Sequence, residues 1–307
     1  MYSGTICDIP GILVGHAQDF DAKTGVTAIL CPKGAAGGVD VRGAAPGTRE
    51  TDLLRCGAMV REVHAILLCG GSAFGLAAAD GAMRFLSERQ IGLAVGNIKV
   101  PLVPAAVLFD LFCGRSDVRP DAGMGYRACE SALNTFLQGS VGAGTGATVG
   151  KTVPGAMPGK GGVGSASITL PGGIIVAAVA AVNALGDVYH PHTGALIASG
   201  TVNGKPVSFK NLLEYGGQAA ENPFQNTTIG VAATNAKLSK EQANRLALTA
   251  HDGIARTIFP AHTEMDGDTI FALAAGEITE GFDMISLCAA ASEAFARAIV
   301  NAVEAAQ

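Results

Sequence analysis

Short runs of small apolar residues, separated by glycine-rich turns, set the strongest constraint on how this chain folds. Such runs occupy residues 27–31, 65–69 and 228–234, and a longer pair, 168–170 and 174–184, flanks the turn Pro171-Gly172-Gly173. Short apolar runs bounded by turn residues are typical of buried strands. Because the side chains are small, we expect sheets that pack closely against another layer.

Helical periodicity separates these strands. Residues 73–89 place Phe74, Ala78, Gly81, Phe85 and Leu86 on one face, Ser239 and Gln242 have capping-box spacing before a second helix, and residues 282–306 are alanine-rich. Strands and helices do not alternate as regular βαβ units. We therefore expect an α+β architecture in which helices cover paired sheets. Residues 200–226 are polar and turn-rich, and predict a flexible surface segment.

Composition excludes several functional classes. Of 307 residues, 49% are hydrophobic and 15% charged, which favours burial between subunits as well as within one. The net charge is −5 and no basic run occurs, so we expect no nucleic acid partner. Seven cysteines form no C-x-x-C pair, which favours reduced thiols in a cytoplasmic protein. The first residues do not resemble a signal peptide, and the longest apolar run, 174–182, is too short to span a membrane.

Three local motifs resemble known sites but have the wrong context. Residues 142–147 have the G-x-G-x-x-A outline of a dinucleotide loop, yet the sequence that follows does not sustain a helix. Ser72 stands between a strand and a helix as a serine nucleophile does, but Phe74 replaces the glycine of G-x-S-x-G, so a helix cap is the better interpretation. His190 and His192 lack a third metal ligand at a recognisable spacing, which favours a solvated turn.

The junction between Asn226 and Thr227 indicates a function more specifically than these three motifs do. A polar segment ends at Asn226, and Thr227 begins a buried strand. An N-terminal-nucleophile hydrolase needs this arrangement before it cuts itself, because the hydroxyl attacks the preceding carbonyl. The freed α-amine, with a pKa near 8, then serves as the base. A threonine at a strand start is in itself only a sign of β-propensity.

The surroundings of the junction resemble one family. The blocks 39–54, 70–81, 141–151, 161–167, 176–188, 226–236 and 266–276 are similar, in order, to those of the L-aminopeptidase/D-Ala-esterase/amidase family of self-cleaving hydrolases. That family includes β-aminopeptidases and nylon-oligomer hydrolases. The resemblance implies an αββα sandwich, one catalytic domain over 1–307, and self-cleavage into chains 1–226 and 227–307 that associate as a homotetramer.

The resemblance also implies roles for individual residues. Thr227 is the expected nucleophile and Asn226 the residue before the cut, while Lys151 and Asn183 resemble a lysine near the nucleophile and an oxyanion donor. Asp266 and Asp268 match an acidic pair that orients the nucleophile. Without a catalytic role, Lys151 would be a surface lysine on a glycine loop, and Asp-Gly-Asp would be an ordinary turn.

Two departures leave the substrate open. Phe109 stands where some members place a tyrosine hydroxyl, and other members use serine in place of Thr227. We expect a small peptide or amide substrate, with no metal and no organic cofactor. Two alternatives remain at this point: an acyltransferase that uses the same threonine, and an inert binding or assembly protein.

Overall fold

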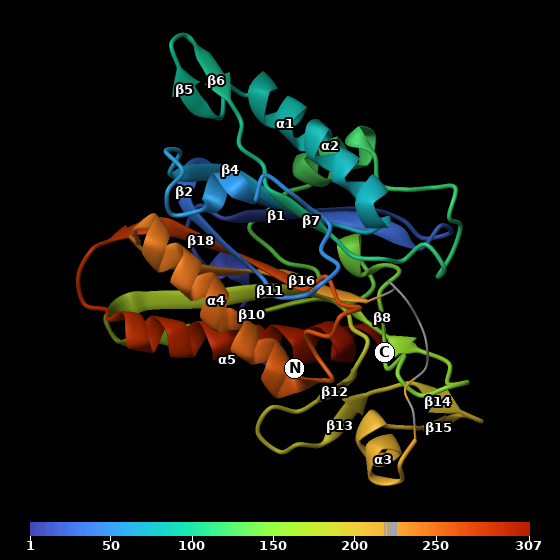
Figure 1. Cartoon of the computed structure of the whole chain (residues 1–307). Helices are drawn as coiled ribbons and strands as arrows, with labels where there is room; N and C mark the ends of the chain where they lie inside the picture. Colours follow the sequence, from blue (N-terminus) through green and yellow to red (C-terminus); the bar gives the residue numbers. More distant parts are fainter. Residues whose placement is uncertain (218, 220–225) are drawn as a thin grey trace.

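Four layers make up the molecule, with two sheets stacked between two pairs of helices (Figure 1). The computed structural model describes residues 1–217, 219 and 226–307. The first sheet layer contains β1 (Leu13–Asp19), β2 (Thr24–Val41), β3 (Thr48–Arg49), β4 (Glu62–Cys69) and β7 (Ala105–Val107). The second contains β10 (Gly162–Leu170), β11 (Ile174–Asn183), β16 (Thr227–Ala236) and β18 (Thr269–Ile278). The covering helices are α1 (Ala78–Glu88), α2 (Ala122–Glu130), α4 (Lys240–Thr257) and α5 (Met284–Ala306). This architecture confirms the expected αββα sandwich.

Short elements connect and extend these layers. They are the 3-10 segments η1 (Ile6–Asp8), η2 (Asp52–Leu54), η3 (Ser72–Ala77), η4 (Gly142–Gly144) and η5 (Pro171–Gly173) and the strands β5 (Leu93–Val95), β6 (Ile98–Val100), β8 (Thr148–Val149), β9 (Gly159–Lys160), β12 (Asp187–Tyr189), β13 (Leu196–Ala198) and β17 (Ile258–Phe259). No helix follows the glycine-rich residues 142–147, as their sequence indicates.

The long strand β2 joins the two sheets. Its first half pairs antiparallel with β1 and β4, and its second half pairs antiparallel with β18. A register shift between Leu30 and Ala35 marks the place where the strand passes between layers. Within the second sheet, β16 lies between β11, which is antiparallel to it, and β18, which is parallel.

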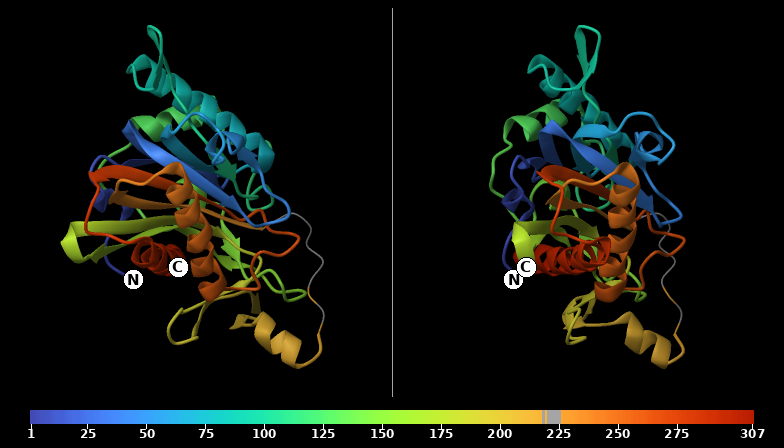
Figure 2. Two further views of the ribbon diagram at one scale, coloured as in Figure 1. Left: turned by 60° about the vertical axis from the view of Figure 1, so that its left-hand side comes forward. Right: turned by 90° about the vertical axis from the view of Figure 1, so that its left-hand side faces the viewer.

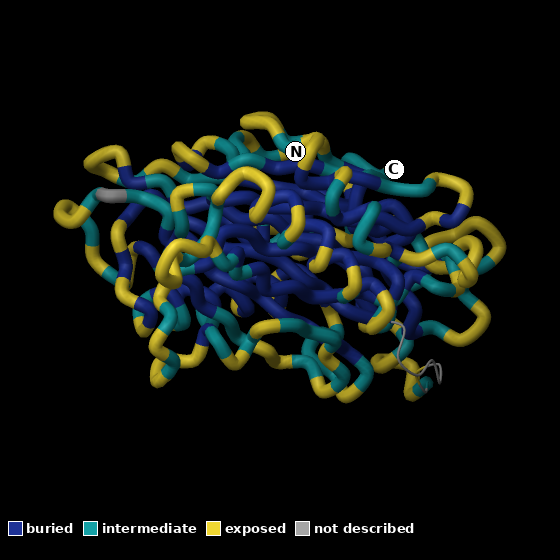
Figure 3. The backbone as a smooth tube through the Cα atoms, turned by 90° about the horizontal axis from the view of Figure 1, so that it is seen from above, coloured by how far each residue is buried: buried dark blue, intermediate teal, exposed yellow. Residues whose placement is uncertain are grey.

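Three buried cores fill the spaces between the four layers. Neighbouring residues of one strand face different cores: Val231 points between the sheets, whereas Ala232 points towards α4 and α5. A third core lies between the first sheet and the helices α1 and α2. Because side chains alternate along a strand, an uninterrupted apolar run can serve two cores at once. Figure 3 shows this buried interior enclosed by exposed loops.

The expected helices differ from the observed ones mainly at their ends. The capping box of Ser239 and Gln242 is present at the start of α4. The segment expected as one helix over 73–89 begins instead as η3. Phe74, expected on the buried face, is 55% exposed and lies under the guanidinium group of Arg119. The expectation for that first turn is wrong because the tighter 3-10 geometry rotates its side chains relative to an α-helix.

The polar segment 200–226 contains more regular structure than its sequence indicates. The strands β14 (Thr201–Val202) and β15 (Lys205–Pro206) form a hairpin, and α3 (Phe209–Glu214) follows with Ser208 as its cap. Most of these residues are exposed or half-buried, as expected of a surface segment, and the expected flexibility stays a prediction. The remainder of that expectation falls on residues 218 and 220–225, which lie outside the described residues.

The two chain ends meet beside α5 (Figure 2). The N-terminal amine pairs with Glu304 at 2.8 Å, and the Tyr2 backbone exchanges hydrogen bonds with Asn301. Among the described residues, α5 alone is long and apolar enough to cross a membrane, and 61% of that apolar stretch is buried inside the protein. Burial of this kind is typical of a core helix.

Close packing of β16 against α5 generates the first prediction. A Cβ at Gly230 would lie against the Val179 carbonyl oxygen and 2.6 Å from the Phe295 ring. We expect Gly230→Ala to lower the free energy of unfolding by about 1–3 kcal/mol, the usual cost of overpacking a core. Urea unfolding followed by circular dichroism measures this. Gly57→Ala is the matched control, because a Cβ at Gly57 meets nothing within 4 Å. Equal midpoints for the two variants would contradict the packing described here.

Candidate active site

Thr227 is the first residue of β16, and its position is fixed on both sides. It pairs with Asn183 at the end of β11, and the preceding Asn226 forms a parallel bridge with Asp266. Both Asn226 and Thr227 are buried, at 2% and 5% exposure. The sequence prediction that Thr227 begins a buried strand is confirmed.

The carbonyl group of Asn226 receives two hydrogen bonds. The Thr227 hydroxyl donates one to its oxygen, and the Gly267 backbone N–H donates another at 3.2 Å. A Cβ on residue 267 would lie 2.9 Å from the Thr227 hydroxyl oxygen and 2.7 Å from the Ala45 carbonyl oxygen. Residue 267 therefore has to be glycine for its backbone to come this close. The result is a hydroxyl and an N–H donor that converge on one peptide carbonyl.

Asp266 and Asp268 hold the backbone on either side of this glycine. Asp268 accepts a hydrogen bond from the Thr228 N–H at 2.7 Å and contacts His262 Nδ1 at 2.8 Å. Asp266 accepts bonds from the Thr263 N–H at 2.8 Å and hydroxyl at 2.7 Å. Burial, followed by the nearby Asp268 charge, raises the pKa of Asp266 to about 6. The acidic pair thus lies beside Thr227 and orders its surroundings through backbone and loop contacts.

Asn183 and Lys151 form a buried polar pair next to Thr227. Lys151 Nζ donates to Asn183 Oδ1 at 3.0 Å, and Asn183 Nδ2 donates to the Phe109 carbonyl oxygen at 2.9 Å. The Thr148 N–H donates to the same Asn183 oxygen at 3.0 Å. Burial lowers the pKa of Lys151 to about 7, although the charges of Cys113 and Asp266 partly oppose this. Lys151 is 6% exposed, so the alternative of a surface lysine is wrong.

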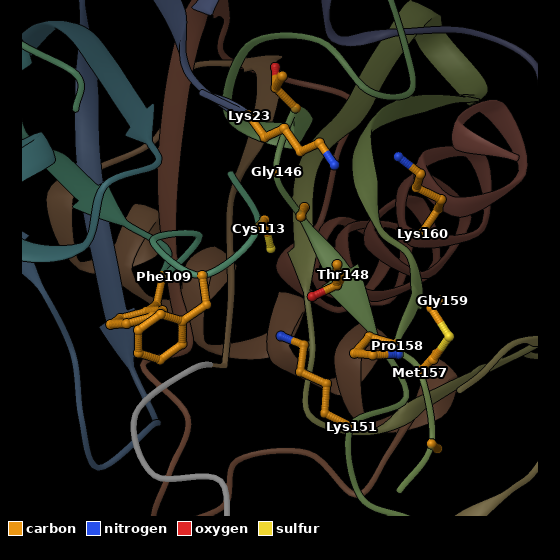
Figure 4. A pocket seen from close by; sticks show the side chains of 14 residues that line it. Lys23, Phe109, Cys113, Gly146, Thr148, Lys151, Met157, Pro158, Gly159 and Lys160 are labelled. Carbon is orange, nitrogen blue, oxygen red and sulfur yellow. The ribbon is translucent and has the colours of Figure 1, made fainter. Parts of the chain in front are cut away.

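Two cavities meet at Phe109. The smaller, about 270 Å³, is lined by Ser72, Asn226 and Thr227 among apolar residues that include Ala45, Gly47 and Met265. The larger, about 650 Å³, contains Lys151 and Thr148 and is lined in addition by Lys23 and Lys160 (Figure 4). Phe109 lines both cavities and Thr227 lines the smaller one, so a substrate group bound in the smaller cavity would lie against the threonine.

Some residues of this site were not found by sequence reasoning. These are His262, Thr263 and Gly267, which hold the acidic pair and the Asn226 carbonyl. Phe109 was noted in the sequence only for its missing hydroxyl, and in the structure it contributes a backbone carbonyl. The only local signal for His262 and Thr263 was their position four and three residues before Asp266. Burial lowers the pKa of His262, but its hydrogen bond with Asp268 and the Asp268 charge outweigh burial and raise it.

The structure also places the histidines and the serine that the sequence suggested as alternative sites. His190 Nε2 lies 3.1 Å from the Tyr2 hydroxyl, and His192 Nε2 lies 2.9 Å from Glu293. Ser72 does not cap its helix, because Gly71 occupies the cap position and no side-chain cap bond forms. Ser72 instead has φ of +54° and lines the smaller cavity. Strained backbone of this kind is common at functional sites, so Ser72 stays a rival nucleophile to be tested.

Comparisons with known proteins find relatives that are named as amide-hydrolysing enzymes. An uncharacterized aminopeptidase of Mycobacterium tuberculosis (strain ATCC 25618 / H37Rv) is 47% identical over 290 residues, covering 89% of this chain and 82% of that protein. A 6-aminohexanoate-oligomer endohydrolase of Kocuria sp. (strain KY2) is 33% identical over 279 residues, covering 88% and 75%.

The solved structures agree on the fold. The L-aminopeptidase D-Ala-esterase/amidase of Ochrobactrum anthropi, described as a variant of the Ntn hydrolase fold, superimposes with a TM-score of 0.75 at 19% identity over 99% of this chain and 86% of that one. The pattern of peptidase family S58 matches residues 4–307. Together with the buried threonine site, these findings identify an amide-hydrolysing enzyme: the chain belongs to peptidase family S58.

Proposed function

We propose that this chain cuts its own peptide bond between Asn226 and Thr227, and that Thr227 then acts as an N-terminal nucleophile in amide hydrolysis. The observation that carries the proposal is the carbonyl group of Asn226, towards which the Thr227 hydroxyl and the Gly267 N–H both point. An N–H donor at this position would stabilise the negative charge that develops on the carbonyl oxygen during attack.

Both reactions use the same atoms. In self-cleavage, the Thr227 oxygen bonds to the Asn226 carbonyl carbon, the C–N bond breaks, and the hydroxyl proton ends on the freed amine. Water then hydrolyses the ester and leaves Asn226 with a carboxylate. In turnover, the free α-amine, whose ordinary pKa is near 8, takes the hydroxyl proton while Thr227 attacks the substrate carbonyl. An acyl-enzyme forms, the substrate amine leaves, and water releases the acid.

The neighbouring polar groups support these steps. In this proposal, the Lys151 ammonium and the Asn183 amide contribute positive charge and a donor beside the nucleophile. Asp266 and Asp268 keep residues 226–228 in position through the bridge to Asn226 and the bond to the Thr228 N–H. The hydrolase names of the relatives favour water as acceptor over an amine, and family membership argues against an inert binding protein. The cleaved homotetramer and its cytoplasmic location stay predictions.

Our second prediction concerns the nucleophile. We expect the purified protein to contain chains 1–226 and 227–307, the smaller with 307 − 226 = 81 residues. Thr227→Ala removes the attacking oxygen, so it should remain one chain without amidase activity, whereas Ser72→Ala should still be cut. Intact mass and N-terminal sequencing, which should read Thr-Thr-Ile-Gly, measure this. A Thr227→Ala chain that is cut and active, beside an inactive Ser72→Ala chain, would assign the reaction to Ser72.

The third prediction concerns the side chain of Asn226. Its amide oxygen and nitrogen are buried without a hydrogen-bond partner among the described residues. Removing such a group is close to neutral or stabilising. We expect Asn226→Ala to be cut at the same bond, with a rate within about fivefold of the parent. A time course of intact mass measures this rate. If Asn226→Ala stays whole, the asparagine side chain takes part in breaking the bond and the threonine mechanism is incomplete.

The fourth prediction uses the lowered pKa of Lys151. A pKa near 7 means that the folded chain binds fewer protons than the unfolded chain between pH 7 and the ordinary lysine pKa of 10.5. The free energy of unfolding therefore gains a positive slope with pH in this window from Lys151. On an uncut Thr227→Ala background, Lys151→Met should lose that contribution. Urea midpoints at pH 7 and pH 9 measure the difference, and identical pH slopes in the two proteins would refute the buried cation.

A further inference from the structure

We propose that the larger cavity is a subsite for a carboxylate carried by the leaving amine of the substrate, so that the enzyme prefers amides of amino acids with a free carboxyl group. This inference rests on the proposed function of Thr227. It names the class of substrate that the site takes, a short peptide or N-acyl amino acid with an unblocked carboxyl end.

Lysine side chains enclose the cavity from different parts of the chain. Lys23 comes from the turn between β1 and β2, Lys160 from β9, and Lys151 from the loop beyond β8. In Figure 4 the amines of Lys23 and Lys160 extend towards one another across the cavity. Neither of these two lysines forms an ion pair with a described residue, and none of the described lining residues is acidic. Two cations that face each other without an anion between them fit a negatively charged ligand.

The chain holds Lys23 in place by a constrained backbone. Lys23 has φ of +54°, a left-handed conformation that is unfavourable for a residue with a Cβ. Gly146 packs its backbone against the Lys23 carbonyl oxygen, and Asp19 accepts hydrogen bonds from the Asp21 and Ala22 N–H groups of the same turn. A glycine would adopt this conformation at lower cost. The constrained backbone therefore sets the point from which the exposed Lys23 side chain extends along the edge of the cavity.

Lys160 is fixed by the strand that carries Thr148. The ladder of β8 and β9 places Lys160 opposite Thr148, and directly paired residues point to the same face of a sheet. Thr148 lines the cavity and its N–H donates to Asn183. The same two-stranded ribbon therefore connects Lys160 to the residues beside Thr227.

The orientation of the substrate follows from Asn226. In self-cleavage Asn226 supplies the acyl group, and it lines the smaller cavity together with Thr227. The acyl part of an external substrate would occupy this cavity after Asn226 has left. The larger cavity, which Phe109 also lines, would then receive the leaving amine. Its apolar lining, which includes Phe112 and Met157, suits the hydrocarbon part of that amine and its lysines suit the carboxylate.

The test compares an alanyl dipeptide that has a free carboxylate with its C-terminal carboxamide. Both are cut at the same bond, and they differ only in one charge. We expect the acid to have the higher kcat/KM, and the difference to come from a lower KM. Lys23→Met and Lys160→Met should each reduce this preference by about fivefold, which is the scale of one exposed charge pair. Hydrolysis of the carboxamide should fall less than hydrolysis of the acid in both variants, because the carboxamide has no charge for the lysines to attract. Lys99→Met, which removes the same charge on β6 away from both cavities, is the matched control.

A second measurement does not depend on catalysis. Cys113 lines the cavity, whereas Cys56 is exposed elsewhere. Uncut Thr227→Ala protein is alkylated either with iodoacetate, which is an anion, or with iodoacetamide, which is neutral. Peptide mapping gives the rate at each thiol, and the ratio is the iodoacetate rate divided by the iodoacetamide rate. Because the same thiolate attacks both reagents and displaces iodide from each, the ratio of rates reports the local preference for an anion. We expect this ratio to be several times higher at Cys113 than at Cys56, and to fall in Lys23→Met and Lys160→Met.

The outcomes separate the subsite from the proposed function. An active enzyme that cuts acid and carboxamide equally, or that keeps its preference in both lysine variants, overturns the carboxylate subsite. Equal alkylation ratios at Cys113 and Cys56 overturn it as well. If the ratio is raised at Cys113 but the protein hydrolyses neither dipeptide, the cavity does bind anions. Its role in binding the leaving amine at Thr227 would then be overturned.

Discussion

β16 is hydrogen-bonded along both edges, and the candidate active site depends on this pairing. The antiparallel ladder with β11 places Asn183 opposite Thr227, and the parallel ladder with β18 begins just beyond the Asp266–Asp268 turn. A strand paired on both sides cannot shift by one residue without turning its apolar side chains to the wrong cores. The register that satisfies the two cores also fixes the nucleophile beside its polar neighbours, and it would keep the two halves together after a cut at residue 226.

Burial of polar groups around Thr227 lowers the stability of the uncut protein, and part of this lost stability would be regained on cleavage. Burial moves the pKa of Lys151 downwards and that of Asp266 upwards, so each charge is disfavoured where it stands. The hydrogen bond that Lys151 donates to Asn183, and the one that Thr263 donates to Asp266, offset part of this cost. The Asn226 amide has no such compensation among the described residues. Release of Asn226 after cleavage would remove an unfavourable buried group, which favours the cut state.

Gly267 serves the reacting carbonyl in the proposed mechanism, whereas the lysines of the larger cavity serve recognition of the substrate. Gly267 lets the backbone approach the Asn226 carbonyl, and the small residues of the nearer cavity leave room for an acyl group. The lysines of the larger cavity stand out against a chain whose net charge is −5. A local positive field inside an acidic protein concentrates anionic ligands at one place. Specificity for the leaving amine would then arise from charge, and specificity for the acyl group from volume.

The sequence by itself determined the central segments of several strands, most of the helices α1, α4 and α5, and the strand start at Thr227, because these depend on local period and turn residues. The run 228–234 had to be a buried strand, and Ser239 with Gln242 had to begin a helix. The roles expected for Lys151, Asn183 and Asp266 came from a family resemblance, since periodicity reports which face of an element is buried and not which faces meet. Only the tertiary structure decided that His262 would hold Asp268, that Gly267 would reach the Asn226 carbonyl, and that Lys23 and Lys160 would share a cavity. Lys23 and Lys160 are far apart in the sequence, and they meet because the stacked sheets bring the β1–β2 turn to the β8–β9 ribbon.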